Sequence, residues 1–293
     1  MSLNKSGSKA QSAASARRLA RRPAKTLRFG MSVDPRHPWD APGSTSTPGR
    51  ADPLAGACVF AGQTLPEELP PDPFPLFQSW LQMSADTRSQ PNPNAMSLAT
   101  VDADGKPSVR IVLARRVYPD KGCVVFFTNY DSRKGEAIHA SHRVAACFHW
   151  DHLDRQVRIE GVATVSPVSE SDTYFTRRPL MSRVAAWASS QSRPLASRQQ
   201  LLDSNARVEA RFGVTGGDEK VKTMSPEEVA AISVPRPPNW GGFRLWVSSM
   251  ELWLGHSARL HDRAVWRREL TPTPVDGAPG YVGGQWSVTR LQP

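Results

Sequence analysis

Two arginines and a histidine lie close together near the C-terminus, in the segment Trp253-Leu-Gly-His-Ser-Ala-Arg259-Leu-His261-Asp-Arg263. The i, i+2, i+4 spacing of Arg259, His261 and Arg263 predicts three side chains on one face of an extended strand. Fixed cations beside a titratable imidazole are costly to bury unless an anion binds to them. The segment therefore indicates either a site for an anionic ligand or a solvated, charged strand.

A second basic cluster, Ser132-Arg133-Lys134, follows the apolar run Phe126-Phe-Thr-Asn129. This order predicts a strand, a turn and the N-terminus of a helix, where free backbone N–H groups and the helix dipole attract phosphate. Arg133 and Lys134 would add charge-assisted hydrogen bonds. The alternative is an ordinary capped helix, which is disfavoured because cations in the first turn oppose the dipole unless an anion binds there. We therefore expect a phosphate site.

A hydroxyl, a guanidinium and a second hydroxyl recur at helical spacing further along the chain, at Tyr174, Arg178 and Ser182. Residues spaced i, i+4, i+8 share one helix face, and this set would suit a second phosphate. Pro179 interrupts the helix before the third member. The alternative is a solvated basic face, since Arg177 and Arg183 add charge and no acid follows Asp172 until Asp203.

Three further positions carry weaker signals. Arg110 stands alone in an apolar strand, so it is either an edge residue or a buried cation that awaits an anion. Gln156 and the pair Gln191-Ser192 offer uncharged donors suited to a heteroaromatic ring edge or a phosphate.

Metal binding has little support in the sequence. Cys147, His149 and His152 could supply three ligands, but Asp151 is the only evident fourth, and a strand followed by a turn explains the spacing without metal. We expect no metal. The three cysteines have no paired spacing, which is typical of a reduced, intracellular protein. The sequence also lacks a Gly-rich dinucleotide fingerprint, a P-loop and a nucleophile elbow.

The periodicity predicts helices inserted between antiparallel strands, hence an α+β fold with a closed barrel. Helices are expected from Pro73, over 132–140, over 169–190 with a break at Pro179, and over 198–212. Strands are expected over 96–102 and 108–115 around an Asp104-Gly105 turn, then over 123–128, 144–150, 155–165, 242–247, 250–254, 263–268 and 286–291.

The charge of +10 over 293 residues is concentrated at the N-terminus. Residues 1–33 carry eight Lys or Arg and no acid, so the rest is near +2, which argues against a nucleic-acid-binding body. No apolar run reaches the roughly 20 residues of a membrane helix.

The N-terminal composition also predicts how the chain is divided. Residues 1–70 are rich in Ser, Ala, Pro, Gly and Arg and are expected to be a largely disordered extension. A folded domain would span 71–293, with a surface insertion at about 214–239. Residues 1–30 have the composition of a mitochondrial transit peptide or of an ordinary basic tail. We expect a cytoplasmic protein, or a mitochondrial one if this segment is a transit peptide.

Taken together, these motifs resemble one family, the FMN-dependent pyridoxine (pyridoxamine) 5′-phosphate oxidases of vitamin B6 metabolism. The resemblance covers about residues 70–293 in unbroken order. The matching pieces are Asp72-Pro73, Arg110-Ile-Val-Leu113, Phe127-Thr-x-x-x-Ser132-Arg-Lys134, Arg155-Gln156, Tyr174-Phe-x-x-Arg178-Pro, Ala186-Trp-x-x-x-Gln191-Ser192, Trp240-Gly-Gly-Phe-Arg244, Trp253 with Arg259-Leu-His-Asp-Arg263, and Arg290-Leu-x-Pro293.

The resemblance implies a homodimer with an FMN-binding split β-barrel, mostly antiparallel and with peripheral helices, and FMN at the subunit interface. It assigns FMN binding to Arg110, Ile111, Val112, Leu113, Phe127, Thr128, Ser132, Arg133, Lys134, Gln156, Gln191, Ser192, Trp253 and Arg263. It assigns substrate binding to Arg115, Tyr174, Arg178, Ser182, Arg259, Leu260 and His261, with Arg259 and His261 as the catalytic pair.

The reaction implied is oxidation of pyridoxamine 5′-phosphate and pyridoxine 5′-phosphate to pyridoxal 5′-phosphate. A hydride passes from C4′ of the substrate to flavin N5, and dioxygen reoxidises the flavin to give hydrogen peroxide. The amine substrate gives an imine that hydrolyses, whereas the alcohol gives the aldehyde directly. Arg259 and His261 would orient the pyridine ring and manage its protons.

This chain departs from the family at three places. Arg115 stands where Lys is usual, Phe127 where Tyr is frequent, and the N-terminal Arg-Tyr lid motif has only a faint counterpart around Arg28. Two alternatives therefore remain: a split-barrel FMN oxidase for another substrate, such as a phenazine precursor, and a flavin- or B6-phosphate-binding protein without turnover. Tyr174, Arg178 and Ser182 favour a phosphorylated substrate, and a carrier would not need Arg259 and His261.

Overall fold

The computed structural model describes residues 63–214 and 216–293, which lie in one compact unit, Gly56–Pro293. Residues 1–62 lie outside the described residues. They include the whole candidate transit segment and most of the predicted N-terminal extension. Packed residues begin before the predicted boundary at residue 71. Leu65 is buried, and its backbone N–H donates to Asp262 Oδ2 at 2.8 Å. Among the described residues, no helix is long and apolar enough to cross a membrane.

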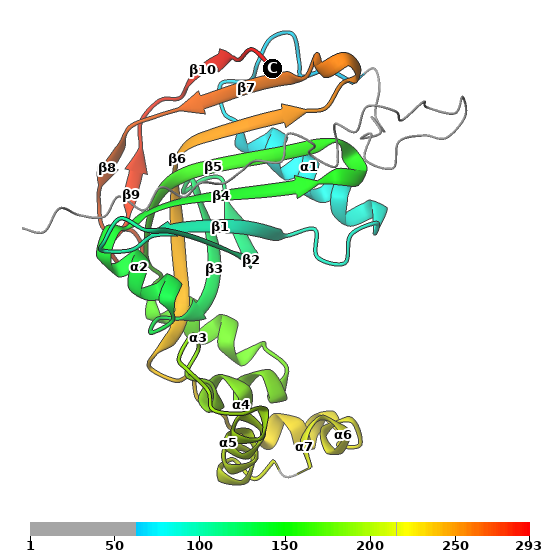
Figure 1. Ribbon diagram of the computed structural model, residues 1–293, viewed down its shortest axis with the longest axis vertical. Coiled ribbons are helices and arrows are strands. Elements are labelled where there is room, and N and C mark those ends of the chain that lie inside the picture. The colour runs from blue at the N-terminus through cyan, green and yellow to red at the C-terminus, as the bar shows by residue number, and fades with distance from the viewer. Residues whose placement is uncertain (1–62, 215) are drawn as a thin grey trace, which may run out of the picture. The chain divides into compact units, whose positions relative to one another are not determined.

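Six antiparallel strands close into a barrel (Figure 1). Their order is β6-β3-β2-β1-β4-β5, and β5 pairs again with β6 to close the ring. The α+β split barrel expected from the sequence is therefore confirmed. The strands are β1 (Ala95–Val101), β2 (Pro107–Tyr118), β3 (Cys123–Asn129), β4 (Arg143–Trp150), β5 (Arg155–Val165) and β6 (Trp240–Leu254). Outside the barrel, β7 (Asp262–Arg267) and β10 (Ser287–Arg290) continue the sheet from β6, while β8 (Leu270–Pro272) and β9 (Tyr281–Gly283) form a separate ladder.

The two strands predicted over 242–247 and 250–254 are one strand, β6, of 15 residues. Its pairing with β5 shifts by one residue: Glu160 faces Ser249 whereas Gly161 faces Val247. Ser248 is therefore the extra residue of a β-bulge, and its hydroxyl donates to the Glu160 carbonyl at 3.1 Å. A bulge restores the apolar alternation that Ser248 and Ser249 interrupt, and it bends the strand without ending it.

Seven α-helices are assigned in the described residues. Pro179 separates α3 from α4, as predicted, because proline has no N–H to donate within a helix. Residues 214–239, the predicted insertion, contain two short helices, and Val214 and Val234 at its two ends are buried beside Trp240. The helices are α1 (Phe74–Thr87), α2 (Arg133–Ser141), α3 (Val168–Thr176), α4 (Leu180–Ala188), α5 (Arg198–Arg211), α6 (Gly217–Lys222) and α7 (Pro226–Ala231).

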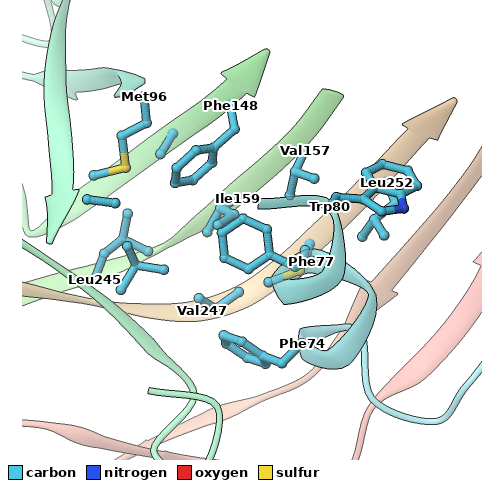
Figure 2. Packing of buried hydrophobic residues seen from close by; sticks show 14 of the residues in the cluster. Phe74, Phe77, Trp80, Met96, Phe148, Val157, Ile159, Leu245, Val247 and Leu252 are labelled. Carbon is cyan, nitrogen blue, oxygen red and sulfur yellow. The ribbon is translucent and has the colours of Figure 1, made fainter. Parts of the chain in front are cut away.

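Helix α1 packs its apolar face onto the barrel core (Figure 2). Phe74, Phe77 and Trp80 are at most 5% exposed, and the Phe77 ring lies 5.1 Å from that of Phe148 in β4. Burying each such side chain is worth about 1.5–3 kcal/mol. The barrel therefore has a rigid core, and its polar residues near the strand ends are held on fixed backbone.

Candidate functional site

A cavity of about 430 Å³ lies beside β2, β3, α4 and the first residue of β6. Eleven of the candidate site residues line this cavity, and they include members of both predicted phosphate-binding clusters. They are Ile111, Val112, Leu113, Arg115, Phe127, Thr128, Lys134, Tyr174, Arg178, Ser182 and Gln191. Asn129, Ala185, Ala186, Ser189 and Trp240 complete the wall.

Lys134 is the buried cation at one side of this cavity. It follows Ser132, the N-cap of α2, whose hydroxyl accepts from Gly135 N–H. The Lys134 ammonium donates to Gln191 Oε1 at 2.6 Å, to Thr128 Oγ1 at 3.0 Å and to Ser132 Oγ at 3.1 Å. Burial, with a smaller contribution from Arg110, lowers the pKa of Lys134 to about 8. All three acceptors are neutral oxygens, so this cation is not neutralised by them and suits an incoming anion.

Arg110 lies on β2 with Leu98 of β1 as its ladder partner, and β3 pairs with β2 only from Ala114 onward. Its Nη1 donates to the Leu98 carbonyl at 3.0 Å and to Thr100 Oγ1 at 2.8 Å. Burial and the nearby Arg133 both lower the pKa of Arg110. This second cation is thus also held by neutral oxygens. Arg133 and Ser192 are exposed, and neither lines the cavity.

The second predicted phosphate group does not lie on one helix. Tyr174 belongs to α3 and Ser182 to α4, while Arg178 lies in the break beside Pro179. All three nevertheless line the cavity together with Arg115. Burial is the main reason that the pKa of Arg178 is lowered, and Arg115 also lowers it; Tyr174 acts in the opposite direction. Arg178 Nη1 is buried without a hydrogen-bond partner, so it has a donor to offer to a ligand.

Three nearly parallel aromatic rings form one wall of the cavity. The Phe127 and Tyr174 centroids are 3.9 Å apart with 9° between the planes, and Phe127 and Trp240 are 5.6 Å apart with 10°. The sequence pointed to Trp240 only as part of a motif and gave it no role. Its place at the start of β6, directly beside β3, depends on tertiary pairing that a single sequence does not display.

The remaining nominated residues lie at the far end of β6. Gln156, Trp253 and Arg263 are register partners on β5, β6 and β7, so they form a row across three strands. The His261 ring lies 4.7 Å from the Trp253 ring.

Glu251 holds Arg263 of this row in place, although no sequence motif pointed to it. Its Oε1 accepts from Arg263 Nε at 3.0 Å and from Nη2 at 2.8 Å, and its Oε2 accepts from Arg158 at 2.8 Å. A buried carboxylate between two arginines fixes the orientation of both. The available signal was a lone acid in the apolar segment Met250-Glu-Leu-Trp-Leu254.

The strand predicted through Arg259, His261 and Arg263 is wrong. Residues Ser257–Arg259 form a 3₁₀ turn in which Ala258 and Arg259 have φ of 54° and 59°, and β7 begins only at Asp262. A positive φ is incompatible with an extended strand. Arg259 and Leu260 are exposed, and the His256 N–H donates to His261 Nδ1 at 3.0 Å. The neutral His261 ring therefore carries its proton on Nε2.

Within one protomer the two groups of nominated residues are well apart. Trp240, on the cavity wall, is the first residue of β6, and Trp253 is the fourteenth. At about 3.3 Å per residue the path along the strand between them is roughly 40 Å. The cavity and this row therefore lie at opposite ends of β6, on either side of the bulge at Ser248.

The candidate metal ligands are spread along β4 and the turn after it. His149 Nε2 lies 4.0 Å from Asp151, and His152 Nε2 lies 3.0 Å from Thr87 Oγ1. Within residues 63–214 and 216–293, no three His, Cys, Asp or Glu side chains are grouped to hold a metal ion.

Two family models match the chain. One described as "Pyridoxamine 5'-phosphate oxidase" matches residues 85–212, and one described as "Pyridoxine 5'-phosphate oxidase C-terminal dimerisation region" matches residues 240–293. The second match supports a homodimer.

Proteins named "Pyridoxine/pyridoxamine 5'-phosphate oxidase" are among the relatives. That of Cupriavidus necator is 43% identical over 226 residues, which is 77% of this chain and 91% of the relative. That of Burkholderia orbicola is 43% identical over 223 residues, 76% of this chain and 90% of the relative.

Solved structures share the fold. PhzG from Burkholderia lata, in complex with tetrahydrophenazine-1-carboxylic acid, superposes with a TM-score of 0.64 at 27% identity over 80% of this chain and 99% of that one. A pyridoxamine 5′-phosphate oxidase-related, FMN-binding protein from Nostoc punctiforme, 17% identical with a TM-score of 0.52 over 77% of this chain and all of its own, shares the fold. On these matches and the barrel described above, the chain belongs to the pyridoxamine 5′-phosphate oxidase family, a family of oxidoreductases.

Proposed function

We propose that this protein oxidises pyridoxamine 5′-phosphate and pyridoxine 5′-phosphate to pyridoxal 5′-phosphate, with FMN as cofactor and dioxygen as the final acceptor. The observation that carries the proposal is the presence of two separate cationic groups in one cavity. Lys134 with its oxygen partners is one, and Arg115 with Arg178 is the other. A flavin mononucleotide and a phosphorylated substrate would each bring one phosphate, and the cavity offers one group for each.

The residues around Lys134 fit the phosphate of FMN. A buried ammonium whose pKa is lowered gains most from a dianion, because the anion offsets the cost of its burial. Thr128 and Gln191 would hydrogen-bond to the phosphate or the ribityl chain, while Ile111, Val112 and Leu113 would contribute backbone and apolar contacts along β2. When bound, FMN supplies a two-electron acceptor for hydride from the substrate.

A second copy of the chain would complete the site. Gln156, Trp253 and Arg263 are roughly 40 Å of strand away from Trp240 in the same protomer. A homodimer with two-fold symmetry can place the row at the end of one β6 against the cavity of the other protomer. Gln156, Trp253 and Arg263 would then border the flavin ring, and Arg259, Leu260 and His261 would lie over the substrate.

The catalytic contribution of the chain is orientation and proton control. Arg115, Tyr174, Arg178 and Ser182 would hold the substrate phosphate and thereby fix the position of the pyridine ring. His261 presents its protonated Nε2 because Nδ1 already accepts a backbone N–H. In this arrangement His261 Nε2 hydrogen-bonds to a ring substituent, and Arg259 lies against the pyridine ring and holds it in position.

An anaerobic absorbance scan tests the proposal. The purified, FMN-loaded protein is mixed with pyridoxamine 5′-phosphate without oxygen, and the flavin band near roughly 450 nm should bleach and return on admission of air. Pyridoxal 5′-phosphate and hydrogen peroxide should form together. A yellow protein that keeps its band with both pyridoxamine 5′-phosphate and pyridoxine 5′-phosphate would refute the proposed reaction and leave two alternatives, oxidation of another substrate and a flavin carrier.

A second candidate is oxidation of a reduced phenazine carboxylate, favoured by the superposition on PhzG. Such a ligand carries a carboxylate in place of a phosphate. The cavity presents Arg115, Tyr174, Arg178 and Ser182 together, which is more donor capacity than one carboxylate uses. A direct competition between pyridoxamine 5′-phosphate and a dihydrophenazine carboxylate, followed by flavin bleaching, decides between the two.

A further inference from the structure

Arg178 is held in an unusual way for a half-buried cation. Among the residues that the structure describes, no carboxylate pairs with it, and its Nη1 has no hydrogen-bond partner. Its guanidinium instead lies over two aromatic faces, with Cζ 4.7 Å from the centre of the Trp240 ring and 5.7 Å from that of Phe175. Both distances are within the roughly 6 Å range of a cation–π interaction.

The Trp240 indole is itself fixed from several sides. It is 8% exposed and stacks with Tyr174 at 6.2 Å and 8°, and the Phe175 ring meets it edge-on at 5.1 Å. The backbone carbonyl of Trp240 accepts from Arg236 Nη1 at 2.6 Å, and Arg236 pairs in turn with Asp172 of α3. The indole is therefore tied to the helix that carries Tyr174 as well as to the strand on which it begins.

We infer that Trp240 is a positioning residue that holds Arg178 for the phosphate of the substrate. An aromatic face fixes a guanidinium but uses none of its N–H donors in the plane. A carboxylate in the same place would neutralise the cation and repel an incoming phosphate. The aromatic support thus leaves Arg178 both charged and free to donate. This inference rests on the proposed function.

The test compares Trp240→Leu and Trp240→Phe with wild type in the FMN-loaded protein. We measure the dissociation constant for inorganic phosphate by calorimetry, together with KM and kcat for pyridoxamine 5′-phosphate. Loss of a partly desolvated cation–π contact should weaken phosphate binding about tenfold in Trp240→Leu and less in Trp240→Phe. KM should rise in parallel, whereas kcat at saturation and flavin content should stay close to wild type. A merely structural role would lower kcat and flavin content instead.

Trp187→Leu is the matched control. Trp187 lies in α4 and carries Arg211 over its ring at the same 4.7 Å, but neither residue lines the cavity. We expect this variant to bind phosphate like wild type. We also expect Trp240→Leu to have no further effect once Arg178 is replaced by Ala, because the two residues act as one unit.

Equal phosphate affinity in wild type and Trp240→Leu would overturn the inference. So would a loss of phosphate affinity in Trp187→Leu as large as that in Trp240→Leu. A third refuting result is that Trp240→Leu weakens phosphate binding as much in the Arg178→Ala background as in wild type. Absence of phosphate binding in wild type would also overturn it. If Trp240→Leu does not fold, Trp240→Phe decides on the same criteria. Wild type that binds phosphate but does not oxidise pyridoxamine 5′-phosphate would refute the proposed function alone, since the comparison of phosphate affinities would still stand.

Discussion

Lys134 should make FMN binding depend on pH. In the free protein, burial lowers the pKa of this ammonium from 10.5 to about 8, so much of it is neutral above pH 8. The phosphate of FMN favours the charged form and raises the pKa again on binding. Binding above pH 8 must therefore take up a proton. By linkage, the affinity for FMN falls as the pH rises through this range.

The magnitude follows from the lowered pKa. With a pKa of about 8, half of the free protein carries a charged Lys134 at pH 8 and about one hundredth at pH 10. We expect FMN to bind about 50-fold more weakly at pH 10 than at pH 8 if the bound ammonium stays charged. From pH 8 to pH 7 the affinity should rise about twofold as Lys134 becomes almost fully charged, and it should then be flat until the phosphate itself begins to protonate, at about pH 6.

The assay is a fluorescence titration of flavin-free protein with FMN between pH 7 and 10, in wild type and in Lys134→Met. The substitution keeps an unbranched side chain in the buried space but removes the charge. At pH 7 it should weaken binding about 10- to 100-fold, the value of a charge-assisted hydrogen bond. Its affinity should then be nearly constant up to pH 10. A Lys134→Met protein with the same decline above pH 8 as wild type would show that another group takes up the proton and would refute this reasoning.

Three further substitutions test the other parts of the site. Glu251→Gln removes a buried charge that holds Arg263, so the free energy of unfolding measured with denaturant should fall by about 3 kcal/mol. Glu160→Gln, at an exposed ion pair, should change it by less than about 1 kcal/mol, and equal effects would contradict the assigned role of Glu251. Arg115→Ala should raise KM for pyridoxamine 5′-phosphate about tenfold or more, whereas Arg115→Lys should restore most of the affinity; an unchanged KM in both would exclude a phosphate contact. Arg259→Ala should lower kcat about 100-fold with little loss of FMN, and equal losses of turnover and flavin would contradict its catalytic assignment.

The parts of the fold that depend on local signals could be predicted from the sequence. The Ser132 cap, the Asp104-Gly105 turn and the break at Pro179 each mark an element boundary through backbone chemistry that is visible in one residue type. The alternation of apolar residues is interrupted at Ser248, and it could not show that β6 continues as one strand beyond this residue. The extra residue is absorbed by pairing with Glu160 on another strand, and that partner is distant in sequence.

The candidate site divides along the same line. Lys134 and Arg178 stand out in the sequence because each belongs to a pair of adjacent basic residues, Arg133-Lys134 and Arg177-Arg178. Trp240 and Glu251 do not, because each acts on an arginine that the fold, and not the chain order, brings next to it: Trp240 on Arg178 over 60 residues earlier, and Glu251 on Arg263 across the β6–β7 pair. Residues that bind a ligand are chosen for their own chemistry, which composition reveals. Residues that position those ligand-binding side chains are selected for where they pack in the folded protein. A site predicted from sequence is therefore expected to include the residues that would bind the ligand and to omit the residues that position them.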